Sequence, residues 1–219
     1  INIFQQGDIM KILVTGATGY IGAHYVKVAA EHGHEVVATD FNFNQNNIEK
    51  YSSQIIDWDF RKPSPMKMSF DKVVHIGAMG SVPLSVKDPW LYYETNVVGT
   101  KNVIDFAECD HFVYCSTGSA FDPAASPYAT TKYGGELLTK QFKENHSLVR
   151  FYNVCGNDGF NKFDTKYSHL IRKAAAVANG KFDTLEIFGT DYDTRDGTCI
   201  RNYTHVVDIV DSLQKVVEN

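Results

Sequence analysis

The feature that most constrains this chain is a glycine-rich turn between a short apolar run and an amphipathic helix. The turn is the stretch Val14-Thr15-Gly16-Ala17-Thr18-Gly19-Tyr20-Ile21-Gly22, which follows the apolar run 11–14. That run is typical of a buried strand, and apolar residues recur on one stripe of the helix predicted over 20–31. A strand, a glycine turn and a helix in this order are typical of the first unit of a dinucleotide-binding fold, although a plain tight turn is the alternative.

The three glycines have separate roles in such a unit. Gly16 permits the tight turn, Gly19 leaves room for a pyrophosphate against bare backbone, and Gly22 lets the helix pack closely on the strand. The start of the helix then directs free N–H groups at the phosphates. The spacing is Gly-x-x-Gly-x-x-Gly and not the commonest Gly-x-Gly-x-x-Gly. We therefore expect cofactor binding here from the position of the turn as much as from its glycines.

Composition excludes several classes of partner. The 219 residues carry a net charge of −5 and no basic block, so nucleic acid is not expected as a partner. No apolar run approaches the ~18 residues that a membrane span needs. The four cysteines are scattered without a Cys-x-x-Cys pair, which favours reduced thiols in a cytoplasmic protein. Residues 1–9 do not have the pattern of a signal peptide, and we interpret them as a leader or an expression remnant.

An acidic residue, Asp40, ends the second predicted strand, 18 positions after Gly22. A carboxylate there accepts hydrogen bonds from an adenosine ribose and repels a 2′-phosphate. No arginine lies between Asp40 and Asp59, so NAD is favoured over NADP. A turn residue before the asparagine-rich loop 42–47 is the alternative for Asp40.

Two further places suit a cofactor. Asp59 and Phe60, after the third predicted strand, can flank an adenine; a strand end and a core aromatic are the alternatives. The stretch Gly77-Ala78-Met79-Gly80 ends the fourth strand and carries two glycines, where backbone can lie along a cofactor. His75 in that strand is surrounded by apolar residues, so we interpret it as a core histidine.

Strands and helices alternate along most of the chain, which predicts an α/β fold with a doubly wound parallel Rossmann sheet. We expect a dinucleotide-binding domain over 10–155, a small, partial substrate lobe over 156–201, and a return to the first domain over 202–219. The predicted strands are 11–14, 35–40, 54–60, 70–78, 111–117, 146–154 and, in the lobe, 185–189. The predicted helices are 20–31, 90–109, 128–144, 167–179 and 206–218.

Chemistry is expected at the carboxyl ends of the strands, where open α/β sheets bind ligands. Thr117 ends the fifth strand, and Tyr128 and Lys132 begin the next helix with a spacing that places them on one face. A nearby ammonium lowers the pKa of a phenol, so Tyr128 is a candidate base for a substrate alcohol. Thr117, or Ser116 or Ser119 beside it, can hydrogen-bond the same oxygen. A surface helix pair is the alternative for Tyr128 and Lys132.

Together these features resemble the extended short-chain dehydrogenase/reductase superfamily, and within it the UDP-galactose (UDP-glucose) 4-epimerases. The similar stretches are 14–22, 75–78, 92–100, 126–128, 150–153, 185–193 and 197–207. They span nearly all of 10–219. The family runs about 100 residues longer, so we expect a C-terminally shortened form.

The resemblance implies NAD as cofactor, a UDP-hexose as substrate, and transient oxidation to a 4-keto sugar. Tyr128 would be the base, Lys132 would hold the nicotinamide ribose, and Thr117 would stand at the family's active-site Ser/Thr. The implied cofactor contacts are Gly16, Thr18, Gly19, Tyr20, Ile21, Gly22, Asp40, Asp59, Phe60, Gly77, Ala78, Asn96, Tyr128, Lys132 and Tyr152. The implied substrate contacts are Thr117, Asn153, Leu170, Phe188 and Arg201.

Rival activities remain within this resemblance. The 4,6-dehydratases carry an Asp-Glu pair where this chain has Gly118 and Ser119, which argues against water elimination. A related dehydrogenase, decarboxylase or reductase of nucleotide sugars, or an NAD-binding remnant without turnover, stays open. Arg201 suits a diphosphate by its forked donors, and a salt bridge between lobes is its alternative. The resemblance also suggests a homodimer through the helices of Trp90 and Tyr128.

Overall fold

The computed structural model describes residues 8–41, 47–160 and 169–219. Within them, six parallel strands form a central sheet in the order β3-β2-β1-β4-β5-β6. The strands are β1 (Lys11–Thr15), β2 (Glu35–Asp40), β3 (Gln54–Asp57), β4 (Met68–His75), β5 (Ala107–Thr117) and β6 (His146–Phe151). The chain winds outward from β1 in both directions, so the predicted doubly wound Rossmann sheet is confirmed.

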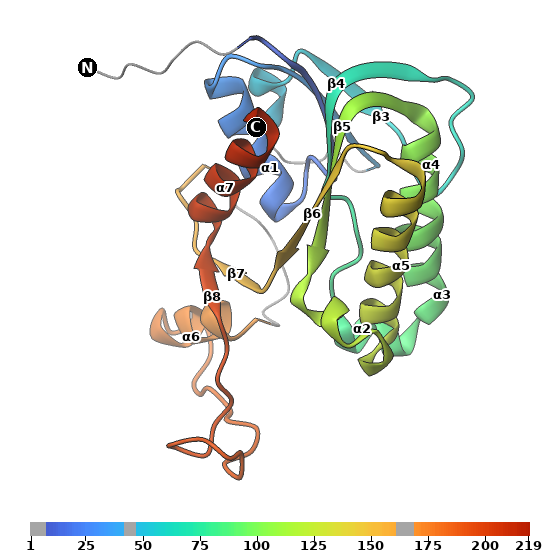
Figure 1. Ribbon diagram of the computed structural model, residues 1–219. Helices are drawn as coiled ribbons and strands as arrows, with labels where there is room; N and C mark the ends of the chain where they lie inside the picture. Colours follow the sequence, from blue (N-terminus) through green and yellow to red (C-terminus); the bar gives the residue numbers. More distant parts are fainter. Residues whose placement is uncertain (1–7, 42–46, 161–168) are drawn as a thin grey trace.

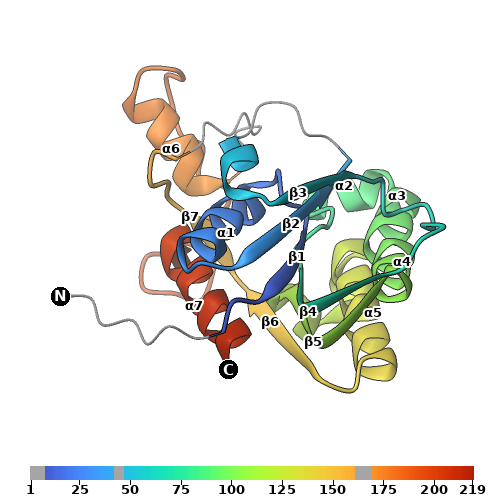
Figure 2. The same cartoon turned by 90° about the horizontal axis from the view of Figure 1, so that it is seen from above.

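Helices cover both faces of this sheet (Figures 1 and 2). On one face lie α1 (Tyr20–Glu31) and α7 (Val206–Glu218). On the other lie α2 (Val82–Lys87), α3 (Pro89–Tyr93), α4 (Gly99–Phe106) and α5 (Pro127–Phe142). None of the described helices combines the length and the apolar character that crossing a membrane requires.

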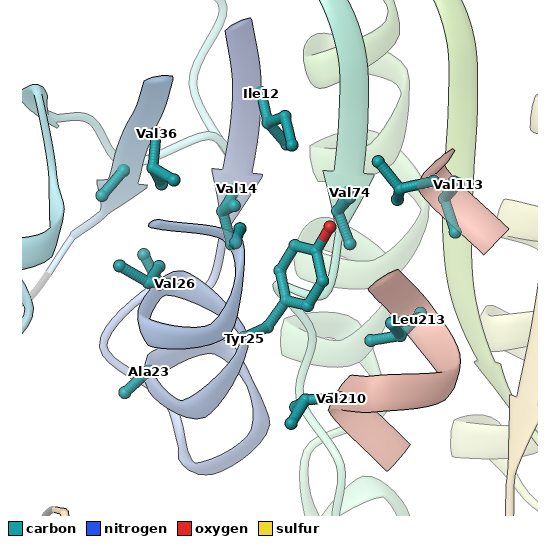
Figure 3. Packing of buried hydrophobic residues seen from close by; sticks show 14 of the residues in the cluster. Ile12, Val14, Ala23, Tyr25, Val26, Val36, Val74, Val113, Val210 and Leu213 are labelled. Atoms are coloured by element: carbon teal, nitrogen blue, oxygen red, sulfur yellow. The ribbon is translucent and has the colours of Figure 1, made fainter. Parts of the chain in front are cut away.

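Two buried clusters hold these layers together. Figure 3 shows the first, which gathers Tyr25 of α1, Val74 of β4 and Leu213 of α7. The second lies on the opposite face of the sheet and includes Phe60 and Phe112. Successive strand residues point to opposite faces, so Leu13 joins one cluster while Ile12 and Val14 join the other. This burial fixes the strand ends that carry the site.

The helix expected over 90–109 is shorter and interrupted. It comprises α3, a π-helical turn η2 (Glu94–Val98) and α4, and it ends at Phe106. Asp88 caps its start by accepting from the backbone N–H of Leu91 at 3.1 Å. The next strand begins at Ala107, because Ala107 pairs with Met68 at the start of β4. Pairing between distant segments therefore overrides the local helical pattern.

Other strands and helices begin or end at residues that differ from the predicted ones. The strands expected over 54–60 and 70–78 are β3 and β4, and the helix expected over 128–144 is α5 with Ser126 as its N-cap. The strand expected over 146–154 divides at Tyr152. Its last part is β7 (Asn153–Cys155), which leaves the main sheet and pairs with β8 (Tyr203–His205).

The expected lobe strand over 185–189 is absent from the structure. Ile187 and Phe188 are exposed there, and no strand in the described part of the chain pairs with them. An isolated extended segment lacks the ladder that defines a strand, which explains the difference. The helix expected over 167–179 is α6 (Leu170–Ala178), with residues 167 and 168 outside the described part. It lies beyond the carboxyl ends of the strands (Figure 1).

Candidate active site

Bare backbone forms the base of the site. Gly16 has a φ of +67°, and a Cβ there would stand 2.6 Å from the Cα of Gly77. A Cβ on Gly22 would stand 2.0 Å from the carbonyl oxygen of Gly16. Real side chains do not fit these distances, so the turn after β1 contacts both α1 and the loop after β4 through glycine alone.

A cleft of about 360 Å³ opens above this base, at the carboxyl ends of β1, β2, β4 and β5. It brings together many of the expected residues. Those that line it are Gly16, Gly19, Tyr20, Ile21, Gly22, Asp40, Phe60, Gly77, Ala78, Tyr128 and Lys132. The glycine turn and the Tyr128 helix, more than 100 positions apart in the sequence, thus contribute to one cleft.

Asp40 stands at the end of β2 with both carboxylate oxygens engaged. Its Oδ2 accepts from the backbone N–H and the hydroxyl of Thr18, at 3.1 and 2.7 Å. Its Oδ1 accepts from the N–H of Phe41 at 2.8 Å. These bonds hold the carboxylate at the rim of the cleft, where a ribose can share its remaining lone pairs.

Lys132 is almost completely buried, with 2% of its surface exposed. Its Nζ donates to the carbonyl of Cys115 at 2.7 Å and lies 4.2 Å from the ring centroid of Tyr114. Burial lowers the pKa of Lys132 to about 8, against the opposing influence of Cys115 and Glu136. Among the residues that the structure describes, no carboxylate forms an ion pair with it.

The expectation that Lys132 lowers the pKa of Tyr128 is wrong for this structure. Burial raises the pKa of the Tyr128 phenol, with the side chain of Thr117 acting in the opposite direction and Tyr92 adding to the rise. The reason is that Lys132 directs its ammonium at the Cys115 carbonyl, so burial dominates. The influence of Thr117 places it beside Tyr128, as the expected arrangement requires.

Several expected residues lie beside the cleft and do not line it. Thr18 is bonded to Asp40, as described above. The side-chain amide of Asn96 makes two hydrogen bonds to the backbone of Met79: it accepts from the N–H at 2.8 Å and donates to the carbonyl at 3.1 Å. Thr117 accepts from the N–H of Ser119 at 3.2 Å. These side chains shape the walls of the cleft from behind.

Asp59 and Tyr152 also lie outside the lining. Asp59 accepts from Nε and Nη2 of Arg61 at 2.8 and 2.7 Å, and this pairing lowers the pKa of Asp59. Arg61 in turn lies over the ring of Phe41 at 5.2 Å. Tyr152 packs against the backbone of Gly118 and is more than half exposed.

The positions expected to hold a sugar nucleotide lie outside the cleft. Phe188 is 79% exposed, and Leu170 is about half exposed. Asn153 donates to the carbonyl of Asn202 at 3.0 Å, and Arg201 to that of Ile200 at 2.8 Å. Arg201 makes no ion pair with any described residue, so the structure does not show the salt bridge between lobes.

Sequence reasoning missed part of the lining. The further lining residues are Phe41, Ile76, Met79, Gly80, Thr95, Cys115, Ser116 and Phe151. Of these, Ser116 is a considered candidate, and Met79 and Gly80 belong to the stretch 77–80 whose backbone is expected along a cofactor. Most follow or precede an expected residue by one position, and that adjacency is the signal that points to them. Thr95 belongs to the π-helical turn, whose wider winding a regular helical spacing does not anticipate.

The cleft fits a polar ligand that approaches backbone closely. The hydroxyl of Thr95 is buried in its wall without a hydrogen-bond partner among the described residues. No described side chain caps α1, whose N-terminus faces the cleft at Gly19. An unpaired hydroxyl, an uncapped helix start and a bare glycine turn together suit a dinucleotide.

Comparison with known proteins identifies the family. The NAD dependent epimerase/dehydratase family matches residues 12–219. The chain belongs to this family. A UDP-glucose 4-epimerase of Halalkalibacterium halodurans is 33% identical over 93% of this chain and 69% of its own length. A UDP-glucose 4-epimerase of Rhizobium meliloti is 30% identical over 94% of this chain and 72% of its own length.

Solved structures of UDP-glucose 4-epimerases have a fold similar to that of this chain. A UDP-glucose-4-epimerase from Stenotrophomonas maltophila, with bound NAD and formylated UDP-arabinopyranose, has a TM-score of 0.84 at 27% identity. The match covers 95% of this chain and 74% of that one. The enzyme from Brucella ovis, in complex with NAD, has a TM-score of 0.80 at 28% identity. The expected resemblance, the Rossmann fold and NAD as the family's cofactor are thereby confirmed.

Proposed function

We propose that this protein is an NAD-dependent 4-epimerase of a nucleotide sugar, of the UDP-glucose/UDP-galactose type. The observation that carries the proposal is the position of Tyr128 and Lys132. They lie one helical turn apart on α5, and both line the cleft that the glycine turn closes. Thr117 acts on the same phenol from the end of β5.

The cleft residues divide the cofactor between them in this proposal. Gly16, Gly19 and the start of α1 would hold the pyrophosphate, because they expose backbone and the positive end of a helix. Asp40 would accept hydrogen bonds from the adenosine ribose. Phe60, which lines the cleft, would flank the adenine, and Asp59 beside it is held by Arg61.

Lys132 is suited to hold the second ribose. An ammonium has three donors, and the structure shows one of them donating to Cys115. The burial that lowers its pKa also means that a ribose hydroxyl binds a poorly hydrated donor. Lys132 therefore positions the cofactor and leaves proton transfer to Tyr128.

The reaction assigned to these residues is reversible oxidation at the hexose C4. Bound NAD would supply the hydride acceptor for this oxidation and the source of the hydride that restores the alcohol. Tyr128 accepts the proton of the 4-hydroxyl, and Thr117 donates a hydrogen bond to the same oxygen. Because burial raises the pKa of Tyr128 in the free protein, a positive charge brought into the cleft is needed to favour the phenolate.

A second candidate function has an observation in its favour. Phe188, Leu170 and Arg201, the proposed sugar-nucleotide contacts, lie on the surface and outside the cleft. A chain with a complete cofactor cleft and dispersed substrate contacts fits a protein that binds NAD without turnover. Both candidate functions use the same cofactor cleft, and they differ in whether the protein catalyses epimerisation.

Proton NMR of the anomeric signals separates the candidates. UDP-galactose is incubated with the protein and NAD⁺, with Tyr128→Phe as the matched variant. The epimerase predicts that UDP-glucose appears, and that Tyr128→Phe slows its appearance by about 10²–10⁴-fold while NAD still binds. Conversion that survives the substitution contradicts the mechanism. No conversion by the wild type, with NAD bound, favours the second candidate.

We also propose a homodimer through α3 and α5. Trp90 of α3 is 77% exposed, and Val98 and Leu137 on neighbouring helices are about half exposed. These helices lie together on the outer face of the molecule (Figures 1 and 2). Exposed apolar side chains on adjacent helices are typical of an interface. Sedimentation of wild-type protein and Trp90→Asp checks this, since the charge is expected to yield monomers.

A cytoplasmic setting is proposed as well. All four cysteines are free thiols, and Cys115 is buried in the cleft wall. Unpaired cysteines are typical of a reducing compartment.

A further inference from the structure

A continuous chain of hydrogen bonds runs beneath the cleft, centred on His75. Gly77 donates its N–H to Thr15 Oγ1 at 3.2 Å, and Thr15 Oγ1 lies 2.6 Å from His75 Nδ1. On the other side of the ring, His75 Nε2 lies 3.0 Å from Thr100 Oγ1. Thr100 donates to the carbonyl of Asn96 at 2.7 Å. All of these side chains are buried.

The geometry determines the direction of every bond in this chain. Thr100 has one hydroxyl proton and donates it to Asn96, so it accepts from His75. His75 therefore carries a proton on Nε2. In a neutral ring Nδ1 is then bare and accepts from the hydroxyl of Thr15, and the oxygen of Thr15 accepts from Gly77. Of the two neutral tautomers, only Nε2–H satisfies all four bonds.

The surroundings of the ring keep it neutral. His75 is 1% exposed and packs against Phe60, Phe112 and Tyr114, with ring centroids 5.6 to 6.0 Å away. Burial lowers the pKa of His75 to about 3, and the ammonium of Lys132 acts in the same direction. The imidazole is thus a fixed donor and acceptor at neutral pH.

The chain ends on residues that shape opposite walls of the cleft. At one end, Thr15 and Gly77 flank the contact between the glycine turn and the loop after β4. At the other, Asn96 holds Met79 through its amide and donates to Thr131 Oγ1 at 3.1 Å. Thr131 donates to the carbonyl of Tyr128 at 3.0 Å.

We propose that His75 is a positioning residue for the cofactor cleft. Through Thr15 and Thr100, its Nε2–H tautomer joins the glycine turn to the π-helical turn that carries Thr95 and Asn96. This inference rests on the proposed function, in which the cleft holds NAD. A core histidine that only fills space would need neither a particular tautomer nor partners on both ring nitrogens.

The tautomer is tested first, in the protein without cofactor. Long-range ¹H–¹⁵N correlation spectra give both ring-nitrogen shifts, with His75→Asn used to assign the signal. We expect one Nε2–H tautomer whose shifts stay constant between about pH 5 and pH 9. An Nδ1–H tautomer, or titration within that range, would overturn the inference whether or not NAD binds.

The positioning role is tested with matched threonine variants. Thr100→Val removes the acceptor of His75 while keeping the shape, and Thr100→Ser restores it. Thr139→Val is the control, because Thr139 is equally buried and donates only to Gly135 within α5. Calorimetry gives the dissociation constant for NAD, and a thermal melt gives the unfolding midpoint of each variant.

The inference predicts that Thr100→Val and Thr139→Val differ in their effect on NAD affinity and on the unfolding midpoint. Thr100→Val is expected to weaken NAD binding about tenfold, and Thr100→Ser to recover most of it. Thr139→Val is expected to lower the midpoint with NAD affinity unchanged. If Thr100→Val lowers only the midpoint and leaves NAD affinity intact, the positioning role is wrong. If the wild type itself binds no NAD, it is the proposed function that fails.

Discussion

The cofactor cleft and the segment 169–202, which we call the distal segment, hold their polar side chains in different ways. In the cleft, Asp40 and Lys132 are buried and bonded to named backbone or side-chain partners. In the distal segment, Phe188 is mostly exposed and Arg201 bonds only a neighbouring carbonyl. The cleft is therefore preorganised for a ligand, whereas the distal segment presents residues of suitable chemistry at the surface.

The difference follows from what each region packs against. The cleft lies on a sheet with helices on both faces, and lining residues such as Phe60, Ile76 and Cys115 belong to or pack against the buried core clusters. The distal segment contains one short helix, α6, followed by irregular chain up to β8. Fewer packed neighbours mean lower local stability and more conformational freedom. Substitutions should thus affect stability strongly in the first region and weakly in the second.

The largest effect is expected from breaking the ion pair behind the Tyr128 helix. Glu136 is fully buried, and Arg150 donates to both of its oxygens at 2.8 and 2.6 Å. Arg150→Met leaves that carboxylate buried without its charged partner, which is expected to destabilise the fold by about 3–5 kcal/mol. Urea unfolding at pH 7 measures the change.

The matched control is an ion pair in the distal segment. Lys173 lies 3.5 Å from Glu186, which is about two-thirds exposed. Exposed pairs contribute little, so Lys173→Met is expected to change stability by less than about 1 kcal/mol. Equal losses in the two variants would break the contrast between the regions.

A smaller effect of opposite sign is expected from Lys132→Met in the protein without cofactor. Because burial lowers the pKa of Lys132 to about 8, its charge is destabilising below that pH. Removing it should raise the free energy of unfolding at pH 7 by about 2 kcal/mol, after allowing for the lost bond to Cys115. Denaturant unfolding at several pH values measures this.

The pH dependence gives this prediction its sign. The unfolded lysine titrates near ~10.4 and the folded one near 8, so the wild type regains stability as the pH rises between them. The advantage of Lys132→Met should shrink from pH 8 to about pH 10. A variant less stable than the wild type, or a difference independent of pH, would contradict the assigned burial.

The smallest effect on stability is expected in the distal segment. Phe188→Ala removes a ring that is 79% exposed, so the free energy of unfolding should change by less than about 0.5 kcal/mol. Under the proposed function it weakens binding of the UDP-sugar and leaves NAD affinity unchanged. Calorimetric titration with each ligand separates the two. A marked loss of stability would show that the ring is packed in solution.

The same contrast decides how much could be predicted from sequence. The helices Tyr20–Glu31 and Val206–Glu218 and the strand Glu35–Asp40 begin and end where the sequence patterns predict. In these elements the local sequence pattern and burial agree, because each helix packs one face on the sheet and the strand is buried on both of its faces. The glycine turn and the Tyr128–Lys132 pair are predictable for the same reason.

The predictions from sequence are wrong where contacts between distant segments determine the structure. The early start of β5 at Ala107 depends on pairing with Met68, and the strand expected over 185–189 lacks a partner. The pKa of Tyr128 depends on the depth of burial and on the direction of the Lys132 side chain, neither of which helical spacing reveals. The chain through His75 likewise requires three segments to be placed together.

The central claim is that the glycine turn is a preformed site for NAD, and calorimetric titration of NAD into the wild type and Gly19→Ala tests it most directly. Gly19 has φ −70° and ψ 171°, which alanine also adopts, and an added Cβ meets only the carbonyl oxygen of Gly16 at 3.2 Å. The account predicts that Gly19→Ala keeps an unfolding midpoint near that of the wild type. It also predicts an NAD affinity at least about tenfold lower, since under the proposed function the methyl would occupy the place of the pyrophosphate. Equal affinity of the two folded proteins would contradict the account.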